Sequence, residues 1–386
     1  MSTSEHPRRV LIVTGSRGEY GYLRPIIKLC ESTGRLRHSV VATNMHLLPD
    51  FGNSIREFSE DGIHVDNRIY MALSGYTNVT MVKSLGVFML SFADLLDRQA
   101  PDFVLLAGDR GEQLVAAMAA AHLNIPVAHI QAGERSGNID GMARHAIARF
   151  SHIHFAANED AYDRLVRSGE QEFRVFNVGA PQLDEFLQAK FATPDEIAGR
   201  YNLDLRQPVL LLVQHSTTEQ SSRAADHMRI TLEAVIQSGL QTVVIYPNND
   251  AGSSLIQSVI QQHRSSRVRT ERNVSREIYG GLLNVASVIV GNSSSALIEA
   301  PSFRLPAVNI GRRQTGRFQA KNVIDVPEHC AASIRTAIDK ALDPAFRESL
   351  AGLQNPYGDG RSSERIVDIL SSVKIDERLL YKQLAY

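Results

Sequence analysis

Short hydrophobic runs without in-out alternation recur along this chain, and a stretch with helical spacing follows each of them. Strands that are covered by helices on both faces have this pattern. Strands that alternate with helices predict parallel sheets with right-handed crossovers, and therefore an α/β fold. The runs are Val10–Val13, His38–Ala42, Phe103–Ala107, Val127–Ile130, Arg174–Val178, Val209–Val213, Val243–Tyr246, Ser287–Val290 and Ala307–Ile310.

A polar stretch, Ala192–Gln207, separates the first group of runs from the second, and 386 residues are enough for two domains. We expect an N-terminal Rossmann-like domain over residues 1–195 and a C-terminal Rossmann-like domain over residues 196–365. Their sheets are expected to face each other across a ligand-binding cleft. Residues 366–386 are expected to form a helix and tail that pack back on the N-terminal domain.

The composition excludes several classes of protein. Lys and Arg number 41 against 42 Asp and Glu, so the chain has no excess of positive charge for a broad nucleic-acid surface. No apolar run approaches the roughly 18 residues of a membrane span, and the first residues lack the pattern of a signal peptide. Cys30 and Cys330 are too few and too far apart for a disulfide framework. We expect a cytoplasmic protein without nucleic-acid or membrane partners.

The loop after the first run reads TGSRGEYG, which brings three glycines and Arg17 to the start of a helix. The spacing is not that of the dinucleotide fingerprint G-x-G-x-x-G. Arg17 is placed to pair with a phosphate at the helix start. The alternative is a tight turn between strand and helix, with an exposed arginine.

A second segment, from GDRGE to HIHF, carries polar residues at the ends of two neighbouring runs. Carboxylates at the carboxyl ends of adjacent strands suit acid–base chemistry. Asp140 and Arg144 have the i, i+4 spacing of an ion pair on one helix face. The structural alternative makes the aspartates helix caps and the arginine their partner. The residues are Asp109, Arg110, Glu134, Asp140, Arg144 and His145.

His152 and His154 would point the same way on a strand, as metal ligands do. Neither acidic nor cysteine ligands stand at the usual spacing, and HExxH is absent. We predict that these are core or interface histidines, with no metal site and no cofactor.

The second half of the chain indicates an anion site. GNSSSALIEA places Ser293 and Ser294 at a helix start and Glu299 near the end of that helix. A glutamate there can accept two hydrogen bonds from a ribose diol. His215 and Asn248 each follow a strand-like run, and Arg313 belongs to a basic loop that suits a diphosphate. The alternative is a serine-rich turn with a solvated basic loop.

These motifs, in this order, resemble those of the hydrolysing UDP-N-acetylglucosamine 2-epimerases of bacterial sialic-acid pathways and of the bifunctional animal enzyme. They are GDRGE, AGERSGNIDGMARHAIARFSH, QHSTTE, YPNNDAGS, GNSSSALIEAP and NIGRRQTGR. The resemblance extends over almost the whole chain and implies the glycosyltransferase-B fold and a homodimer or homotetramer. It implies cleavage of UDP-GlcNAc to UDP and N-acetylmannosamine through a 2-acetamidoglucal, at the start of sialic (nonulosonic) acid biosynthesis.

The resemblance also implies a role for each candidate residue. Acid–base chemistry falls to Asp109, Glu134 and Asp140, without division into acid and base, and His215 lies near the diphosphate. Glu299 matches a ribose-binding glutamate, and Arg110 and Asn248 match positions on the nucleotide side. The diphosphate is expected to bind Arg17, Arg313, Ser293 and Ser294, with Arg144 and His145 also in the substrate site.

Two departures from the family pattern fall near the sugar. Ala132 stands where relatives usually have glycine, and Gly141 stands where they usually have a second acid. A UDP-2,4-diacetamido-2,4,6-trideoxyhexose, as on the legionaminic acid route, is therefore an alternative substrate. Further alternatives are a non-hydrolysing 2-epimerase, a glycosyltransferase and an inactive sugar-nucleotide-binding regulator. The hydrolysing-type motifs, the absence of a convincing acceptor site and the presence of all three acids argue against these, respectively.

Overall fold

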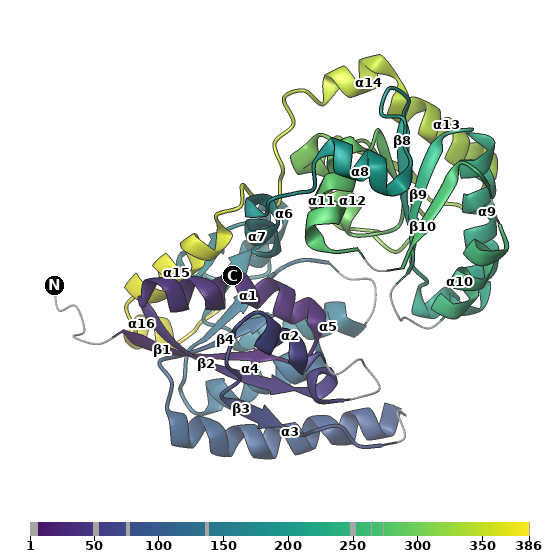
Figure 1. Cartoon of the computed structure of the whole chain (residues 1–386). Helices are drawn as coiled ribbons and strands as arrows, with labels where there is room; N and C mark the ends of the chain where they lie inside the picture. The colour runs from purple at the N-terminus through teal and green to yellow at the C-terminus, as the bar shows by residue number, and fades with distance from the viewer. Residues whose placement is uncertain are drawn as a thin grey trace. The chain divides into compact units, whose positions relative to one another are not determined.

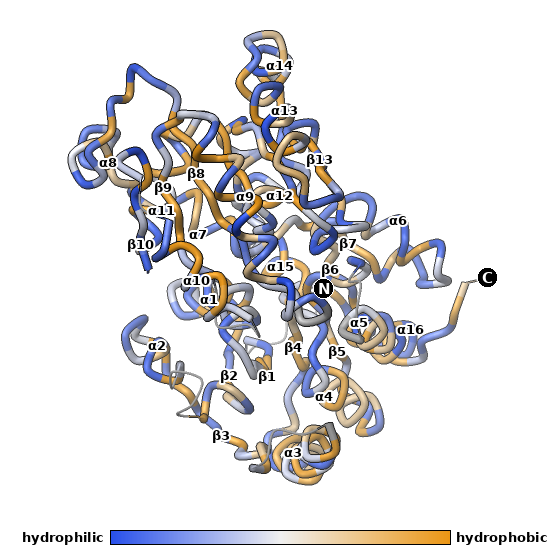
Figure 2. Tube along the Cα trace, turned by 90° about the vertical axis from the view of Figure 1, so that its right-hand side faces the viewer, coloured by the Kyte–Doolittle hydropathy of each residue, from blue (hydrophilic) through white to orange (hydrophobic). Residues whose placement is uncertain are grey.

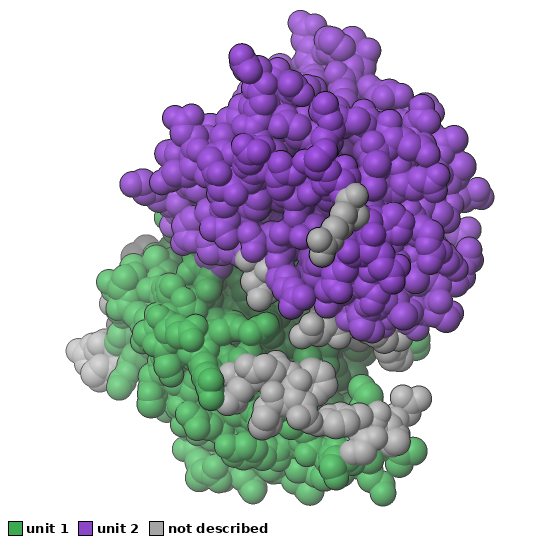
Figure 3. All heavy atoms as spheres, turned by 45° about the vertical axis from the view of Figure 1, so that its right-hand side comes forward, with its two compact units in different colours: residues 1–187, 357–386 green, residues 188–356 purple. Residues whose placement is uncertain are grey.

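The computed structural model describes residues 7–48, 54–74, 78–135, 139–247, 252–263, 265–272 and 274–385, with only the backbone described at 78, 139, 140, 218 and 219. The chain divides into two compact units, which are coloured separately in Figure 3. Unit 1 comprises Met1–Leu187 and Tyr357–Tyr386, and unit 2 comprises Gln188–Pro356. The chain passes from one unit to the other between residues 187 and 188 and again between residues 356 and 357. The boundaries expected from the sequence are 195/196 and 365/366.

Unit 1 contains a parallel sheet whose described strands follow the order β3-β2-β1-β4-β5-β6-β7 (Figure 1). The chain leaves β1 toward β2 and later places β4 on the other side of β1, so the order reverses between β1 and β4. Open α/β sheets bind ligands at such a point. The strands are β1 (Arg8–Thr14), β2 (Leu36–Thr43), β3 (Asn67–Ile69), β4 (Phe103–Ala107), β5 (Val127–Ile130), β6 (Ile153–Ala156) and β7 (Val175–Asn177).

Helices cover both faces of this sheet. Alternate residues of β1 accordingly pack into two separate apolar clusters, one on each face. Ile12 packs in a cluster with Leu23 of α1 and Ile366 of α15, and Leu11 packs in another with Phe88 of α3. The helices of unit 1 are α1 (Arg17–Thr33), α2 (Ile55–Glu60), α3 (Asn78–Gln99), α4 (Gly111–His122), α5 (Ile139–Phe150), α6 (Glu159–Arg167), α7 (Gln182–Gln188, ending across the boundary), α15 (Ser362–Ser372) and α16 (Glu377–Leu380), with short 3₁₀ turns η1 (Asn44–Leu47) and η3 (Glu172–Arg174).

The returning C-terminal segment is anchored in unit 1 by buried polar contacts. The backbone N–H of Ala180 donates to the carbonyl of Tyr357 at 2.7 Å, and the Tyr357 side chain is fully buried. The Asp184 carboxylate accepts the backbone N–H groups of Ser362 at 3.0 Å and Ser363 at 2.5 Å. These contacts satisfy free amides in the first turn of α15, which then packs against α1.

Helix α3 corrects one expectation from the sequence. Its segment Val79–Gln99 is long and apolar enough to pass a test for a membrane span based on length and composition. Phe88, Phe92 and Leu96 nevertheless pack in the core of unit 1 with no exposed area. Only 28% of this segment is buried, so packing against the sheet explains one face of α3 and leaves the rest of it exposed.

Unit 2 contains a second parallel sheet, with described strands in the order β10-β9-β8-β11-β12-β13. Its order reverses between β8 and β11, and its hydrophobic strands β8 and β9 appear orange in Figure 2. The prediction of two parallel-sheet α/β domains is confirmed. The strands are β8 (Val209–Val213), β9 (Gln241–Ile245), β10 (Val268–Glu271), β11 (Val288–Gly291), β12 (Ala307–Ile310) and β13 (Val323–Val326).

In unit 2, α9, α10 and α13 share one apolar cluster with the strands, and α11 and α12 also contact strands of the sheet. The helices are α8 (Pro194–Tyr201), α9 (Ala224–Gln237), α10 (Ser253–Gln262), α11 (Arg276–Val285), α12 (Ser295–Ile298), α13 (Ala331–Leu342) and α14 (Pro344–Ser349), with 3₁₀ turns η4 (Thr218–Arg223) and η5 (Ala300–Phe303).

Candidate active site

The loop after β4 presents Asp109 at the point where the sheet order of unit 1 reverses. Gly108 precedes it with φ +82°, a conformation that favours glycine, and this turns the chain out of the sheet. Asp109 forms a close ion pair with Arg144 of α5, whose other terminal nitrogen donates to the carbonyl of Gln131 at 2.8 Å. Arg144 is 2% exposed, whereas the Asp109 side chain is 21% exposed. A buried cation therefore orients a carboxylate that still reaches solvent.

Glu134 follows β5 and is held from the neighbouring strand. Its Oε1 accepts from Asn158 Nδ2 at 3.0 Å, while Asn158 Oδ1 caps α6 by accepting the N–H of Ala161 at 2.9 Å. Gly133 has φ +78°, and a Cβ built on it would lie 2.4 Å from the Ala161 carbonyl oxygen. Only glycine fits there, so this turn fixes Glu134, which is 4% exposed, at the carboxyl edge of the sheet.

The two departures from the family pattern are both buried. The methyl group of Ala132 lies in an apolar cluster with Ala148, Ala156 and Ala161, and it is 0% exposed. Gly141 is buried on α5. The Ala132 side chain therefore contributes to the core of unit 1, and the expectation that this position lies near the sugar stays a prediction.

The remaining unit 1 candidates lie around the same loops with different partners. Arg17, exposed at the start of α1, pairs with Glu57 of α2 at 2.5 Å between Nε and Oε1. Arg110 Nε donates to Glu112 Oε1 at 3.0 Å. His145 is exposed on α5, and partial desolvation followed by the nearby Arg144 lowers its pKa. The predicted Asp140–Arg144 pair lies outside the described side chains.

In unit 2, the loops after β8 and β11 are tied together by a reciprocal pair of hydrogen bonds. The backbone N–H of His215 donates to Asn292 Oδ1 at 2.7 Å, and Asn292 Nδ2 donates to the His215 carbonyl at 2.9 Å. Gly291 allows this approach, because a Cβ there would lie 2.1 Å from the Val213 carbonyl oxygen. His215 is thus placed where the sheet order of unit 2 reverses.

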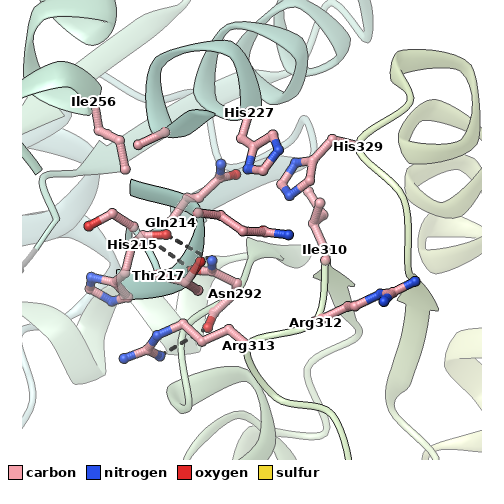
Figure 4. Close-up of a pocket in the computed structure, with 14 residues that line it drawn as sticks. Gln214, His215, Thr217, His227, Ile256, Asn292, Ile310, Arg312, Arg313 and His329 are labelled. Carbon is pink, nitrogen blue, oxygen red and sulfur yellow. Dashed lines mark hydrogen bonds between the residues drawn. The ribbon is translucent and has the colours of Figure 1, made fainter. Parts of the chain in front are cut away.

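A small cavity of about 10 Å³ opens beside these loops. Gln214 and Ser216 line it, and each has a buried side-chain oxygen without a hydrogen-bond partner among the described residues. His227 and His329 are stacked at the far wall with ring centroids 3.7 Å apart. Figure 4 shows His215 and the Arg313 guanidinium on the opposite side from this stacked pair.

The groups nearest His215 are suited to an anion. Arg313 Nη1 donates to the Asn292 carbonyl at 3.2 Å, which holds the guanidinium beside the loop after β11. Ser293 and Ser294 precede α12, and the Ser293 hydroxyl accepts the N–H of Ser295. Burial and then Arg313 lower the pKa of His215 to about 4. At neutral pH His215 therefore offers a neutral N–H donor, and Arg313 supplies the positive charge.

Glu299 lies at the end of α12. Its Oε2 is buried and has no hydrogen-bond partner among the described residues. Burial raises its pKa, and the hydroxyl of Tyr279 lies nearby, bonded to Ser295 Oγ at 2.6 Å. Because α12 spans only Ser295–Ile298, its dipole is smaller than that of the longer helix read from the sequence. An acceptor left open in this way is what a vicinal diol would satisfy.

Comparison with known proteins identifies the family. The model of the UDP-N-acetylglucosamine 2-epimerase family matches residues 28–371. The chain belongs to the UDP-N-acetylglucosamine 2-epimerase family.

The hydrolysing UDP-N,N'-diacetylbacillosamine 2-epimerase of Legionella pneumophila is 39% identical to this family member over 381 residues, covering 98% of this chain and 100% of the relative. The UDP-N-acetylglucosamine 2-epimerase of Neisseria meningitidis is 29% identical over 366 residues and 95% of each chain. The crystal structure of a Neisseria meningitidis UDP-GlcNAc 2-epimerase bound to UDP-GlcNAc matches with a TM-score of 0.79 at 20% identity, covering 94% of this chain and 99% of that one. The resemblance to hydrolysing 2-epimerases is thereby confirmed.

The structure of this 2-epimerase-family chain also shows two buried glutamates beside the candidate residues that the sequence did not single out. Glu19 and Glu112 lie at the starts of α1 and α4, 3% and 2% exposed, beneath the loops that carry Arg17 and Arg110. The motifs GSRGE and GDRGE contain both glutamates, and this shared glutamate after R-G was the available signal. Asn248, assigned from the sequence, lies outside the described residues.

The histidines that suggested a metal have other partners. His154 Nε2 contacts Glu170 Oε2 at 2.9 Å, and the His152 ring accepts the N–H of Val127 at 3.1 Å. Within the described part of the chain, no group of three or more His, Cys, Asp or Glu is arranged to hold a metal ion. These two residues are explained by the packing of β5, β6 and the C-terminal tail.

Proposed function

We propose that this protein is a hydrolysing 2-epimerase that converts a UDP-2-acetamido sugar into UDP and the free 2-epimer. Three features support the proposal: family membership, the oriented carboxylates of unit 1, and the anion-suited loops of unit 2. The ion pair that presents Asp109 on buried Arg144 carries most weight, because acid–base chemistry at a sugar carbon needs a carboxylate held in a fixed direction.

In this reaction a carboxylate removes the proton from C2 while the C1–O bond breaks and UDP leaves with the electron pair. Water then adds to C1 of the resulting glycal, and a proton returns to C2 from the opposite face. Removal and return need carboxyl groups on different sides of the sugar. Asp109, Glu134 and Asp140 are proposed for these steps, with Arg144 and His145 beside them.

Unit 2 is proposed to bind the UDP part. Negative charge grows on the diphosphate as it leaves, and donors aimed at that charge stabilise the transition state. Arg313, Ser293, Ser294 and His215 are proposed as these donors, joined by Arg17 and Arg110 of unit 1. Because His215 has a pKa of about 4, it donates as a neutral imidazole and does not protonate the leaving group at neutral pH. Glu299 is proposed to bind the ribose diol, and Asn248 a further part of the nucleotide.

The substrate proposed first is a UDP-2,4-diacetamido-2,4,6-trideoxyhexose. The 39% identical relative is named for UDP-N,N'-diacetylbacillosamine and aligns over its full length. UDP-GlcNAc, preferred from the sequence motifs, is the second candidate, since the Neisseria relative at 29% identity is named for it. Either product would enter nonulosonic acid biosynthesis.

Competition between the two sugar nucleotides tests this order. Equal concentrations of both are mixed with the enzyme, and consumption of each is followed by chromatography. We expect the diacetamido sugar nucleotide to be consumed at least about 10-fold faster, the scale of one desolvated polar group. Faster consumption of UDP-GlcNAc would reverse the order and leave the reaction class unchanged.

A cytoplasmic homodimer or homotetramer is proposed for the assembly. Helix α3 exposes several apolar side chains, with Val79, Met81, Val82 and Leu90 each 58% to 74% exposed. Exposed apolar side chains that gather on one element are often found at protein contacts. Sedimentation at micromolar concentration should give a mass at least twice 42.6 kDa, and a monomer would contradict the assembly.

A further inference from the structure

Two buried carboxyl groups lie against the same glycine, Gly15, in the loop after β1 of unit 1. Glu19 Oε2 accepts the backbone N–H of Gly15 at 2.6 Å. A Cβ built on Gly15 would lie 2.3 Å from Oε1 of Glu112. Both glutamates therefore touch the same glycine, one at its amide and the other at its α-carbon. A side chain at position 15 would therefore collide with Glu112 unless that glutamate moved.

The two carboxyl groups differ in their hydrogen-bond partners. Glu112 Oε1 accepts from Asn44 Nδ2 at 2.9 Å and from Arg110 Nε at 3.0 Å, as an ionised carboxylate does. Glu19 Oε1 is buried and has no partner among the described residues, and the same is true of Oε1 on the neighbouring Gln113. An ionised Glu19 would leave negative charge on an unsolvated oxygen, whereas a protonated Glu19 would not.

The charge around the pair leads to the same assignment. Arg110 is the cation whose contact with Glu112 is described, so two ionised glutamates would exceed it by one negative charge. When two carboxyl groups share a buried site, ionising both costs extra free energy because the two negative charges repel each other. Burial and then the Glu112 carboxylate raise the pKa of Glu19 well above its ordinary value. Among the described residues, other titratable or charged groups on or next to these loops are Arg17 and Tyr22 on α1, His46 on η1, and Asp109 after β4.

We propose that Glu19 and Glu112 share a single proton, held on Glu19, and that this pair positions Arg110 and the Gly15 turn for sugar-nucleotide binding. The positioning role rests on the proposed function, whereas the shared proton does not. Loss of the proton at alkaline pH would place a second negative charge under the two loops. Glu112 would then be repelled from Glu19, and the contact that aims Arg110 would weaken. Activity should accordingly fall on the alkaline side through the ionisation of Glu19.

Infrared spectroscopy tests the shared proton without reference to activity. The wild-type protein at neutral pH should show the carbonyl band of a protonated carboxylic acid that is absent from Glu19→Gln. Glu112→Gln should shift the loss of this band to lower pH than in the wild type, because it removes the like charge while the burial of Glu19 remains. Glu57→Gln, a change at a nearby partly exposed glutamate, should keep it. Persistence of the full set of carboxylic acid bands in Glu19→Gln would overturn the proposal. If Glu19→Gln does not fold, an unchanged pH dependence of the band in Glu112→Gln would overturn it.

Kinetics against pH tests the positioning role. Glu112→Gln should raise KM about 10- to 100-fold with a smaller change in kcat, because it removes the anion that orients Arg110. Glu19→Gln mimics the protonated state, so it should lower kcat/KM less than Glu112→Gln and should lose the alkaline limb. An alkaline limb in Glu19→Gln identical to that of the wild type would refute this role. Shared-proton bands without turnover of either sugar nucleotide would count against the proposed function alone.

Discussion

Replacing Arg144 tests whether the buried cation directs the chemistry. Arg144 donates both to Asp109 and to the Gln131 carbonyl, 2.8 Å away, and it is 2% exposed. Lysine retains the charge but has one compact donor group, so it cannot reproduce the planar two-point contact. We expect Arg144→Lys to lower kcat by about 10- to 100-fold, since one hydrogen bond to a charged group is worth about 1.5–3 kcal/mol.

Arg144→Met should have a larger effect, because it leaves Asp109 without this cation. Breaking a buried pair costs about 3–5 kcal/mol of stability, and the 21% exposure of Asp109 places the expected loss near the lower end. Initial rates of UDP release and urea unfolding separate the two effects. Arg149→Lys is the matched control, since Arg149 lies on the same helix but pairs with Glu170 and not with Asp109. Wild-type kcat/KM in Arg144→Met, with the protein folded, would refute the reasoning.

The other predictions concern stability, nucleotide binding and pH. Gly133→Ala should lower the free energy of unfolding by more than about 2 kcal/mol, because of strain at φ +78° and contact with the Ala161 carbonyl. Gly199→Ala on α8, which has open space around it, should be neutral or stabilising. Equal urea midpoints for the two variants would contradict this prediction. Glu299→Ala should weaken UDP binding about 10- to 100-fold by calorimetry, and unchanged affinity would remove the ribose assignment. Burial lowers the pKa of His129 from 6.5 to about 3. Between these two pH values the unfolded chain binds a proton that the folded chain excludes, so the free energy of unfolding falls as the pH is lowered. His129→Asn should flatten this pH dependence, and the exposed control His122→Asn should not.

The central strands were predictable because strands that are buried on both faces consist almost entirely of hydrophobic residues. Each of the predicted hydrophobic runs overlaps a strand, and β4 and β8 are buried at every position. The strands that were missed are mostly edge strands with polar residues, such as β3 (NRI) and β10 (VRTE). An edge strand is covered on fewer sides, so its sequence carries less of the hydrophobic pattern.

The site was predictable in its positions and less so in its pairings. Asp109, Glu134 and His215 do follow buried strands, as their places in the sequence indicated. The Arg144–Asp109 pair, in contrast, joins residues on different elements, which no local spacing reveals. Glu19 and Glu112 were overlooked because a glutamate in the first turn of a helix normally faces solvent and favours the helix dipole. Their burial follows from the contact of two loops, which only the folded chain creates.

Turnover in deuterated water, followed by proton NMR, tests the central claim most directly. The enzyme is given the diacetamido sugar nucleotide or UDP-GlcNAc, and the products are identified in the reaction mixture. The account predicts UDP and a free 2-epimerised sugar that carries deuterium at C2. A free sugar that retains its original proton at C2, or a UDP-linked 2-epimer as the accumulating product, would contradict elimination followed by hydration.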